Sequence, residues 1–300
     1  MYGNSKHVLE PFKFNIYEIQ KEMPNAEYHS RSEYSSSFLK TTHKHSVGKA
    51  LSPIDQEMFA LQFGDAFHEF MEIGNLSDRF AIKPGKDEPL LDEDGNIQKD
   101  DDGSIILSKA WNGATKEGKA WKAANMGKII LERNHIENIQ GMHDSVMSIP
   151  LIKNLLEDES LERRDEWSFF ADGDDIHTKG MKFRIRTDVH FYNKETGSVK
   201  CVIDWKTCND LRKLIKWGFL GDFAYHVQAV FYCDVLGIDP RLFIFICVEK
   251  EPPYSARPFR LSDDTIEKAR YDIKDVLVRI NNWENNPKDN DIDLPKIVEI

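Results

Sequence analysis

A continuous apolar run at residues 242–248 constrains the fold of this chain more than any other stretch. It contains only leucine, phenylalanine, isoleucine, cysteine and valine, a composition typical of a strand that is buried on both faces of a sheet. Helical patterns precede and follow it at residues 222–236 and 263–283, and Gly237 ends the first of them. The run therefore predicts an α/β core.

Three more strands are predicted upstream of this run. Residues 166–170 form the first, and residues 181–191 form the second, where apolar and polar side chains alternate as in a half-buried strand. A turn at residues 194–197 leads to the third strand at residues 199–206. Because tight turns join these strands, we expect an antiparallel meander.

Helical patterns dominate the sequence before these strands. A short helix is expected after the N-capping serines at residues 35–37, a second one over residues 52–74, and a longer one over residues 130–157 that Pro150 interrupts. The whole order predicts a mixed sheet flanked by helices, with a helical N-terminal elaboration.

We expect one elaborated domain over residues 1–300, because a chain of this length fits one large domain. It would consist of a mostly helical part at residues 1–160, a sheet-and-helix core at residues 161–285 and a polar tail at residues 286–300. The acidic, glycine-punctuated residues 84–104 are predicted to form an exposed loop or a weak hairpin.

Composition is that of a soluble globular protein, with 40% hydrophobic and 30% charged residues. The sequence has no apolar run long enough for a membrane span and does not begin like a signal peptide, so we expect a cytoplasmic protein without membrane contact. The four cysteines show no CxxC spacing, which predicts reduced core thiols and argues against a zinc site.

The formal net charge is −11, which argues against a broad nucleic-acid-binding surface. It does not exclude a metal-dependent nuclease, because such an enzyme needs acidic ligands at the metal ion and only a local basic track for the phosphates. Much of the acid is also confined to residues 87–102 and 157–175.

The strand predicted at residues 199–206 carries the chemistry. Side chains alternate along a strand, so Asp204 and Lys206 share one face and Trp205 points to the other. Asp188, on the preceding strand, adds a second carboxylate. Two carboxylates and the backbone carbonyl of Trp205 suit Mg²⁺, which prefers oxygen ligands. The alternative is a surface ion pair at a strand end.

A magnesium ion at this position would polarise a phosphate and lower the pKa of a bound water, which is what hydrolysis of a phosphodiester needs. Lys206 would orient that water or stabilise charge on the phosphate. Mn²⁺ is an expected substitute for Mg²⁺.

Two helical patterns add polar side chains. Gly64 and His68 lie one turn apart on a face of an N-terminal helix, and Gln228 and Tyr232 lie one above the other on the helix before the apolar run. Taken alone, His68 is typical of a core histidine with satisfied hydrogen bonds, and Gln228 with Tyr232 is typical of a polar spot on a packed helix.

These motifs together resemble the PD-(D/E)XK nuclease superfamily and, more narrowly, its RecB-like branch. They are residues 202–207, the upstream Asp188, the GxxxH pattern at residues 64–68 and the QxxxY pattern at residues 228–232, in the order that this branch uses. Over residues 28–250 the chain also resembles the RecE-type exonucleases (exodeoxyribonuclease VIII) of phages and prophages. The segments that carry this second resemblance are residues 28–29, 35–40, 63–68, 116–121 and 225–228.

The resemblance implies a restriction-endonuclease-like core and a set of metal ligands: His68, Asp188, Asp204 and the backbone carbonyl of Trp205. It implies that Lys206 is the catalytic lysine and that Gln228 and Tyr232 position DNA or this lysine. The chain departs from the superfamily pattern at Thr187, where the family name expects proline.

Cations near the predicted site are candidates for DNA contact. Arg184 and Arg186 are expected on the same strand face as Asp188. A DNA-contacting loop is expected after the catalytic strand, with the candidates Arg212, Lys213, Lys216 and Trp217. A basic N-terminal patch adds Arg31, Lys40, Lys44 and Lys49. Each of these residues, taken singly, is also typical of ordinary surface charge.

The resemblance implies a Mg²⁺-dependent exodeoxyribonuclease that degrades linear double-stranded DNA from its ends, 5′ to 3′, and leaves 3′ single-stranded tails for single-strand annealing. It also implies a homo-oligomeric ring of three or four chains around DNA, a single-strand annealing protein as partner, and a phage or prophage protein in the bacterial cytoplasm. An acidic exterior with a basic channel would fit the net charge.

Two alternatives stay open. One is a RecB-like nuclease of other polarity or substrate, such as single strands or flaps. The other is a catalytically silent scaffold that binds DNA ends in recombination. The presence together of His68, Asp188, Asp204 and Lys206 argues against the silent scaffold.

Overall fold

The computed structural model describes residues 9–52, 59–85, 96–106 and 112–286. The chain divides into two units. The first unit comprises Met1–Gln56, Val146–Glu249 and Ser255–Ile300, and the second comprises Glu57–Ser145 and Lys250–Tyr254. The expectation of a single domain over the whole chain stays a prediction.

The larger sheet of the first unit is mixed, as the sequence predicts. Its strands, in the order β11-β10-β9-β8-β5, are β11 (Ala256–Arg260), β10 (Phe243–Glu249), β9 (Ser198–Cys208), β8 (Val189–Asn193) and β5 (Leu161–Asp165). β9 and β10 run parallel, while the other neighbours run antiparallel. The apolar run at residues 242–248 thus forms β10, which pairs with the strand of Asp204 along its whole length.

A second sheet of the first unit corrects the predicted meander. It has the order β1-β6-β7-β2, with β1 (Phe14–Gln20), β6 (Ser168–Gly173), β7 (Lys182–Arg186) and β2 (Tyr34–Ser35). The strand predicted at residues 181–191 is therefore wrong, because the chain leaves β7 at Thr187 and enters β8 in the other sheet. The alternation of side chains continues across this break, so the pattern could not reveal it.

The first predicted strand also begins later than expected. Glu166 has a φ of 53° and separates β5 from β6, which starts at Ser168 instead of residue 166. A left-handed backbone at a residue with a side chain ends regular pairing. The consecutive strands β5 and β6 therefore belong to two different sheets.

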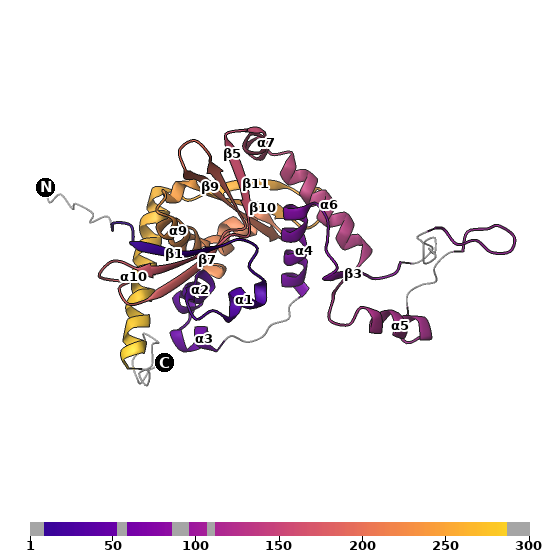
Figure 1. The fold of residues 1–300 in the computed structure, drawn as a ribbon, viewed down its shortest axis with the longest axis horizontal. Helices are drawn as coiled ribbons and strands as arrows, with labels where there is room; N and C mark the ends of the chain where they lie inside the picture. Colours follow the sequence, from indigo (N-terminus) through magenta and orange to yellow (C-terminus); the bar gives the residue numbers. More distant parts are fainter. Residues whose placement is uncertain (1–8, 53–58, 86–95, 107–111, 287–300) are drawn as a thin grey trace. The chain divides into compact units, whose positions relative to one another are not determined.

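Helices of the first unit pack mainly through α2 (Ser36–Lys44), α9 (Tyr225–Leu236) and α10 (Asp263–Asn285), which contact one another (Figure 1). Ser35 caps α2 through a hydrogen bond from the Phe38 amide, and Gly237 ends α9 in the left-handed conformation, both as predicted. The other helical segments are α1 (Asn25–Ser30), α3 (Val47–Leu51), α7 (Pro150–Glu157), α8 (Leu211–Lys213), η1 (Leu214–Asp222) and η2 (Pro240–Leu242).

Helix α9 lies in the core of the first unit. It is buried from Tyr225 to Val235 and contacts α2, α10, β1 and β10. Its aromatic neighbours come from both sheets: Phe231 packs against Phe183 of β7, and Tyr232 packs against Phe243 of β10. A helix buried all round has no solvent for its polar side chains, so those side chains need partners inside the protein.

The second unit contains α4 (Phe59–Ile73), β3 (Phe80–Ile82), α5 (Lys116–Ala124), β4 (Ile129–Leu131) and most of α6 (Arg133–Met147). β3 and β4 form a parallel pair. The helix predicted over residues 130–157 is two helices, α6 and α7, and Pro150 begins α7. The predicted start of α4 at residues 53–58, part of the acidic segment (86–95) and the tail from residue 287 lie outside the described residues.

No helix in the described part of the chain is long and apolar enough to cross a membrane. The cysteines Cys201, Cys233 and Cys247 are buried and Cys208 is half-buried, and all four are free thiols as predicted.

Candidate active site

Asp204 and Lys206 lie on β9, the middle strand of the larger sheet. Asp204 is 1% exposed and pairs across the sheet with Phe245 of β10. The Lys206 ammonium forms an ion pair with Asp204 Oδ2, so the two side chains share a face as strand alternation predicts. Trp205, between them, is also buried. The pair is therefore internal, which does not fit the alternative of a surface ion pair.

Asp188 immediately precedes β8 and lies beside this pair. The antiparallel register of β8 and β9 matches Val189 with Ile203, and its extension by one residue sets Asp188 opposite Asp204. Asp188 Oδ2 accepts a hydrogen bond from the Trp205 amide at 2.8 Å. The break between β7 and β8 thus delivers a carboxylate to the end of the ladder and fixes its orientation.

Gln228 connects Asp204 to a lysine from a distant part of the sequence. Its Nε2 donates to Asp204 Oδ1 at 2.6 Å, and its Oε1 accepts from Lys40 Nζ at 2.9 Å. The amide group therefore uses its donor on the carboxylate and its acceptor on the ammonium, which fixes the orientation of the amide. Gln228 is 5% exposed, so its amide needs hydrogen-bond partners inside the protein.

The two lysines of the cluster have opposite pKa shifts. Burial and, second, the positive charge of Lys206 lower the pKa of Lys40 to about 8. Burial also lowers the pKa of Lys206, but the carboxylates of Asp204 and Asp188 outweigh it and hold that pKa above its ordinary value. Lys206 is therefore firmly charged at neutral pH, whereas the charge on Lys40 is held at a cost.

Lys40 is the residue of this cluster that the sequence did not assign to the site. The sequence predicts only a basic N-terminal patch that includes Lys40, because nothing in the spacing of residues on α2 links position 40 to residue 204. Tyr225 was likewise not singled out, yet Lys206 lies over its ring at 5.4 Å and Lys40 at 5.7 Å. Only the packing of α2 against α9 brings these side chains together.

The donor set fits a hard divalent cation. Asp204 on β9 and Asp188 just before β8 offer carboxylate oxygens, and the carbonyl oxygen of Trp205 lies 3.4 Å from Lys206 Nζ. Mg²⁺ takes carboxylate and carbonyl oxygens and retains several waters. These residues would hold the ion, and Lys206 would stand next to it.

Most of the chain matches a known protein family. Residues 35–291 match the family described as PDDEXK-like domain of unknown function (DUF3799), a range that contains Asp188, Asp204 and Lys206. The chain belongs to this PDDEXK-like family. The match supports the predicted PD-(D/E)XK superfamily and indicates a nuclease, whereas the narrower resemblance to RecE-type exonucleases stays a proposal.

Among solved structures, the fold of this PDDEXK-like chain is similar to a crystal structure of a protein from Eubacterium rectale named "Putative exonuclease". The TM-score is 0.51 at 12% identity, and the alignment covers 90% of this chain and 89% of that chain. At this identity the likeness concerns the fold alone, and it supports the predicted α/β class. A comparison with curated proteins gives no match.

Tyr232 lies one turn beyond Gln228 on α9, as the QxxxY pattern predicts. Its hydroxyl accepts a hydrogen bond from Ser36 at 3.4 Å, so it ties α9 to the start of α2. Burial raises the pKa of Tyr232 well above its ordinary value, which keeps it a neutral phenol. Its role in positioning DNA or Lys206 stays a prediction.

The basic candidates for DNA contact occupy two different places. Arg184 and Arg186 lie on β7, in the second sheet, and their guanidinium groups donate to backbone carbonyl oxygens that include those of Glu33 and Met23. The segment predicted as a DNA-contacting loop is helical instead, formed by α8 and η1. It exposes the remaining candidates: Arg212, Lys213, Lys216 and Trp217. Contact of either group with DNA stays a prediction.

His68 lies on α4 in the second unit of this PDDEXK-like chain and is half-buried. Its assignment as a metal ligand comes from the GxxxH pattern and stays a prediction.

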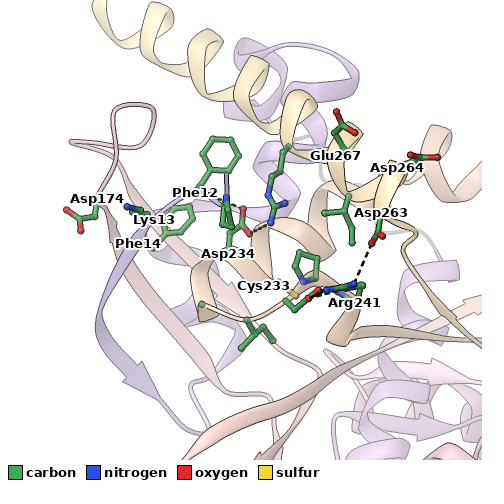
Figure 2. Close-up of a pocket in the computed structure, with 17 residues that line it drawn as sticks. Phe12, Lys13, Phe14, Asp174, Cys233, Asp234, Arg241, Asp263, Asp264 and Glu267 are labelled. Atoms are coloured by element: carbon green, nitrogen blue, oxygen red, sulfur yellow. Dashed lines mark hydrogen bonds and ion pairs between the residues drawn. The ribbon is translucent and has the colours of Figure 1, made fainter. Parts of the chain in front are cut away.

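A separate hollow in the first unit lies at the end of α9. It has a volume of about 800 Å³ and is lined by residues that include Phe12, Asp234, Arg241 and Asp263 (Figure 2). Asp234 accepts hydrogen bonds there from the Phe12 amide and from Arg270, and burial raises its pKa to about 6. None of the carboxylates and lysines of the candidate active site lines this hollow.

Proposed function

We propose that this chain is a Mg²⁺-dependent exodeoxyribonuclease that degrades linear double-stranded DNA from its ends. The observation that carries the proposal is the cluster of Asp188, Asp204 and Lys206 on and beside β9. Asp204 and Asp188 are held in place by donors from Gln228 and Trp205, and the charged Lys206 stands beside them. Membership of a PDDEXK-like family supports a nuclease built on these residue types.

Mg²⁺ held by Asp188, Asp204 and the Trp205 carbonyl would neutralise phosphate charge and lower the pKa of the attacking water. The ammonium of Lys206, which is paired with Asp204 in this structure, would orient the attacking water or stabilise charge on the phosphate. Gln228 fixes the orientation of the Asp204 carboxylate through its 2.6 Å hydrogen bond. The GxxxH pattern supports His68 as a further ligand.

Lys40 supplies a second cation to this mechanism. Its ammonium is bound to an amide oxygen of Gln228, which is a neutral acceptor. A DNA phosphate is a stronger acceptor for an ammonium because it carries a full charge. Lys40 therefore exchanges Gln228 for a phosphate oxygen when DNA binds, and it gains charge stabilisation that the free protein does not provide.

We further propose a 5′-to-3′ direction of degradation that leaves 3′ tails for single-strand annealing. The support for this direction is the resemblance to RecE-type exonucleases over residues 28–250. The same resemblance supports a ring of three or four chains, an annealing protein as partner, and action in the cytoplasm of a bacterial host that carries the phage or prophage. A native mass of three or four times 34.8 kDa would agree with the ring, and a monomer mass would contradict it.

Cleavage of end-labelled linear duplex tests both activity and direction. With Mg²⁺, we expect a label at the 5′ end to be released at once as short products, while the strand labelled at its 3′ end shortens gradually. Covalently closed circular duplex should remain intact. Immediate release of the 3′ label would reverse the proposed direction, preferential loss of single strands or flaps would favour those substrates, and no cleavage with Mg²⁺ or Mn²⁺ would favour a silent scaffold.

A further inference from the structure

A second cluster of possible ligands lies where α2, α9 and α10 meet. It consists of His43 on α2, His226 on α9 and Asp272 on α10, and one ligand atom of each lies within 4.8 Å of the others. His226 and Gln228 are two positions apart on α9, so their side chains point in nearly opposite directions around the helix. The cluster is therefore separate from the candidate active site.

Its distances suit a small tetrahedral ion. His226 Nε2 lies 2.8 Å from Asp272 Oδ2, and His43 Nε2 lies 3.9 Å from the same oxygen. Bonds of 2.0–2.1 Å in a tetrahedron set neighbouring ligand atoms about 3.4 Å apart. The two distances lie on either side of that value, so small side-chain movements complete the arrangement.

The three side chains are of the types that bind zinc-class ions. Imidazole nitrogens and a carboxylate oxygen are ordinary ligands of such ions, and two imidazoles with one carboxylate leave the fourth position of a tetrahedron for water.

The buried imidazole of His226 is engaged through one of its two ring nitrogens. Its side chain is fully buried, its Nε2 contacts Asp272, and its Nδ1 has no hydrogen-bond partner within the described part of the chain. A buried polar ring that is satisfied on one side only carries an uncompensated desolvation cost. The Nε2 atom that faces Asp272 is the one placed to bind a metal ion.

Lys268 is the cation that would compete with a metal ion for Asp272. Its ammonium lies 2.5 Å from Asp272 Oδ2, in a pair one turn apart on α10. Its side chain is 52% exposed, so it can turn into solvent at little cost. Asp275 is the other charged group that acts on His43, and it adds negative potential at the cluster.

We propose that His43, His226 and Asp272 bind one divalent transition-metal ion of the zinc class, with water in the fourth position. Asp272 and His43 are 17% and 23% exposed, which leaves access for that water. The ion joins α10 to the two helices that carry Lys40 and Gln228, so it stabilises the frame of the active site without taking part in the reaction. Short-range spacing in the sequence does not reveal this site, because 183 residues separate His43 from His226 and 46 residues separate His226 from Asp272. The spacing of the cysteines bears only on sites with cysteine ligands.

The full-length protein is loaded with zinc in a buffer that contains Mg²⁺, and unbound zinc is then removed. The test measures the zinc that stays bound. We expect one zinc per chain and a melting temperature that rises by several degrees over the EDTA-treated protein. Asp272→Asn and His43→Gln should each weaken zinc binding at least tenfold. Both changes avoid the fully buried His226, whose replacement could unfold the chain.

Three controls make the result specific. His143→Gln disrupts a histidine–aspartate pair elsewhere on the surface and should retain the zinc. Asp204→Asn should also retain the zinc. Loss of zinc from this variant would assign the ion to the candidate active site and overturn the proposal. Lys268→Met should bind zinc as tightly as the wild type or more tightly. A wild-type protein without stoichiometric zinc, or an Asp272→Asn variant that binds it normally, would also overturn the proposal.

Discussion

Replacement of Asp204 by asparagine is expected to reduce Mg²⁺-dependent cleavage of linear duplex DNA about 10³-fold. The change keeps the acceptor for Gln228 and the shape of the side chain, but it removes the negative charge that would hold the cation. Loss of one charge-stabilising group at a reacting centre costs about 10²–10³ in rate, and here the group also binds the metal ion. The measurement is the initial rate of nucleotide release at saturating Mg²⁺.

The folding of this variant needs a separate check, because Asp204 belongs to a buried ion pair with Lys206. Removal of one partner of such a pair costs about 3–5 kcal/mol, since the other charge stays buried. The double variant Asp204→Asn/Lys206→Met removes both charges and should be more stable than Asp204→Asn, yet equally inactive. Recovery of activity along with stability would show that Asp204 serves folding alone.

A matched control lies in the second sheet. Asp172 and Lys182 form an aspartate–lysine pair at 2.8 Å that is exposed on both sides. Asp172→Asn should change the free energy of unfolding by less than about 1 kcal/mol and leave cleavage unchanged. A comparable loss of activity in this variant would mean that the effect of Asp204→Asn is not specific.

Lys40→Met is expected to make the protein more stable and the nuclease slower. The fall of the Lys40 pKa from 10.5 to about 8 corresponds to about 3 kcal/mol of unfavourable charge burial. Water reaches part of the side chain, so we expect a gain of about 1–2 kcal/mol in the free energy of unfolding at pH 7. Cleavage should fall about tenfold or more, because a phosphate contact is lost.

The pH dependence of this gain has a definite sign. Between about pH 8 and 10.5 the unfolded chain binds the Lys40 proton more readily than the folded chain does, so Lys40 makes wild-type stability rise with pH in this window. The advantage of Lys40→Met is therefore largest below pH 8 and disappears above pH 10.5. Denaturant unfolding of the metal-free protein at pH 7 and pH 9 measures it.

Lys44→Met is the control for Lys40. Lys44 lies one turn further along α2 and donates to the exposed carbonyl oxygen of Asp222. We expect a change of less than about 0.5 kcal/mol in stability and little change in cleavage. If Lys40→Met destabilised the protein, or if it cleaved DNA at the wild-type rate, the assignment of Lys40 to the active site would be wrong.

Local pattern was enough to predict the centre of this fold. The apolar run of β10, the shared face of Asp204 and Lys206, and the end of α9 at Gly237 all follow from periodicity or from a single residue's conformational preference. These features depend on neighbours that are close in the sequence, which is why a single sequence reveals them.

Features that depend on distant packing could not be predicted in the same way. The change of sheet at Thr187 leaves the alternation of residues 181–191 intact, so it has no local signal. Lys40 and His43 acquire their partners only when α2 packs against α9 and α10. The pairing of Gln228 with Lys40 links positions 188 residues apart, and no motif of short spacing describes it.

A crystal structure of the protein grown with Mg²⁺ tests the central claim most directly. We predict one ion bonded at about 2.0–2.1 Å to carboxylate oxygens of both Asp188 and Asp204, with Lys206 turned away from Asp204 towards a water on the ion. An Asp204–Lys206 pair that stays intact at millimolar Mg²⁺, with no ion between the two carboxylates, would contradict the account.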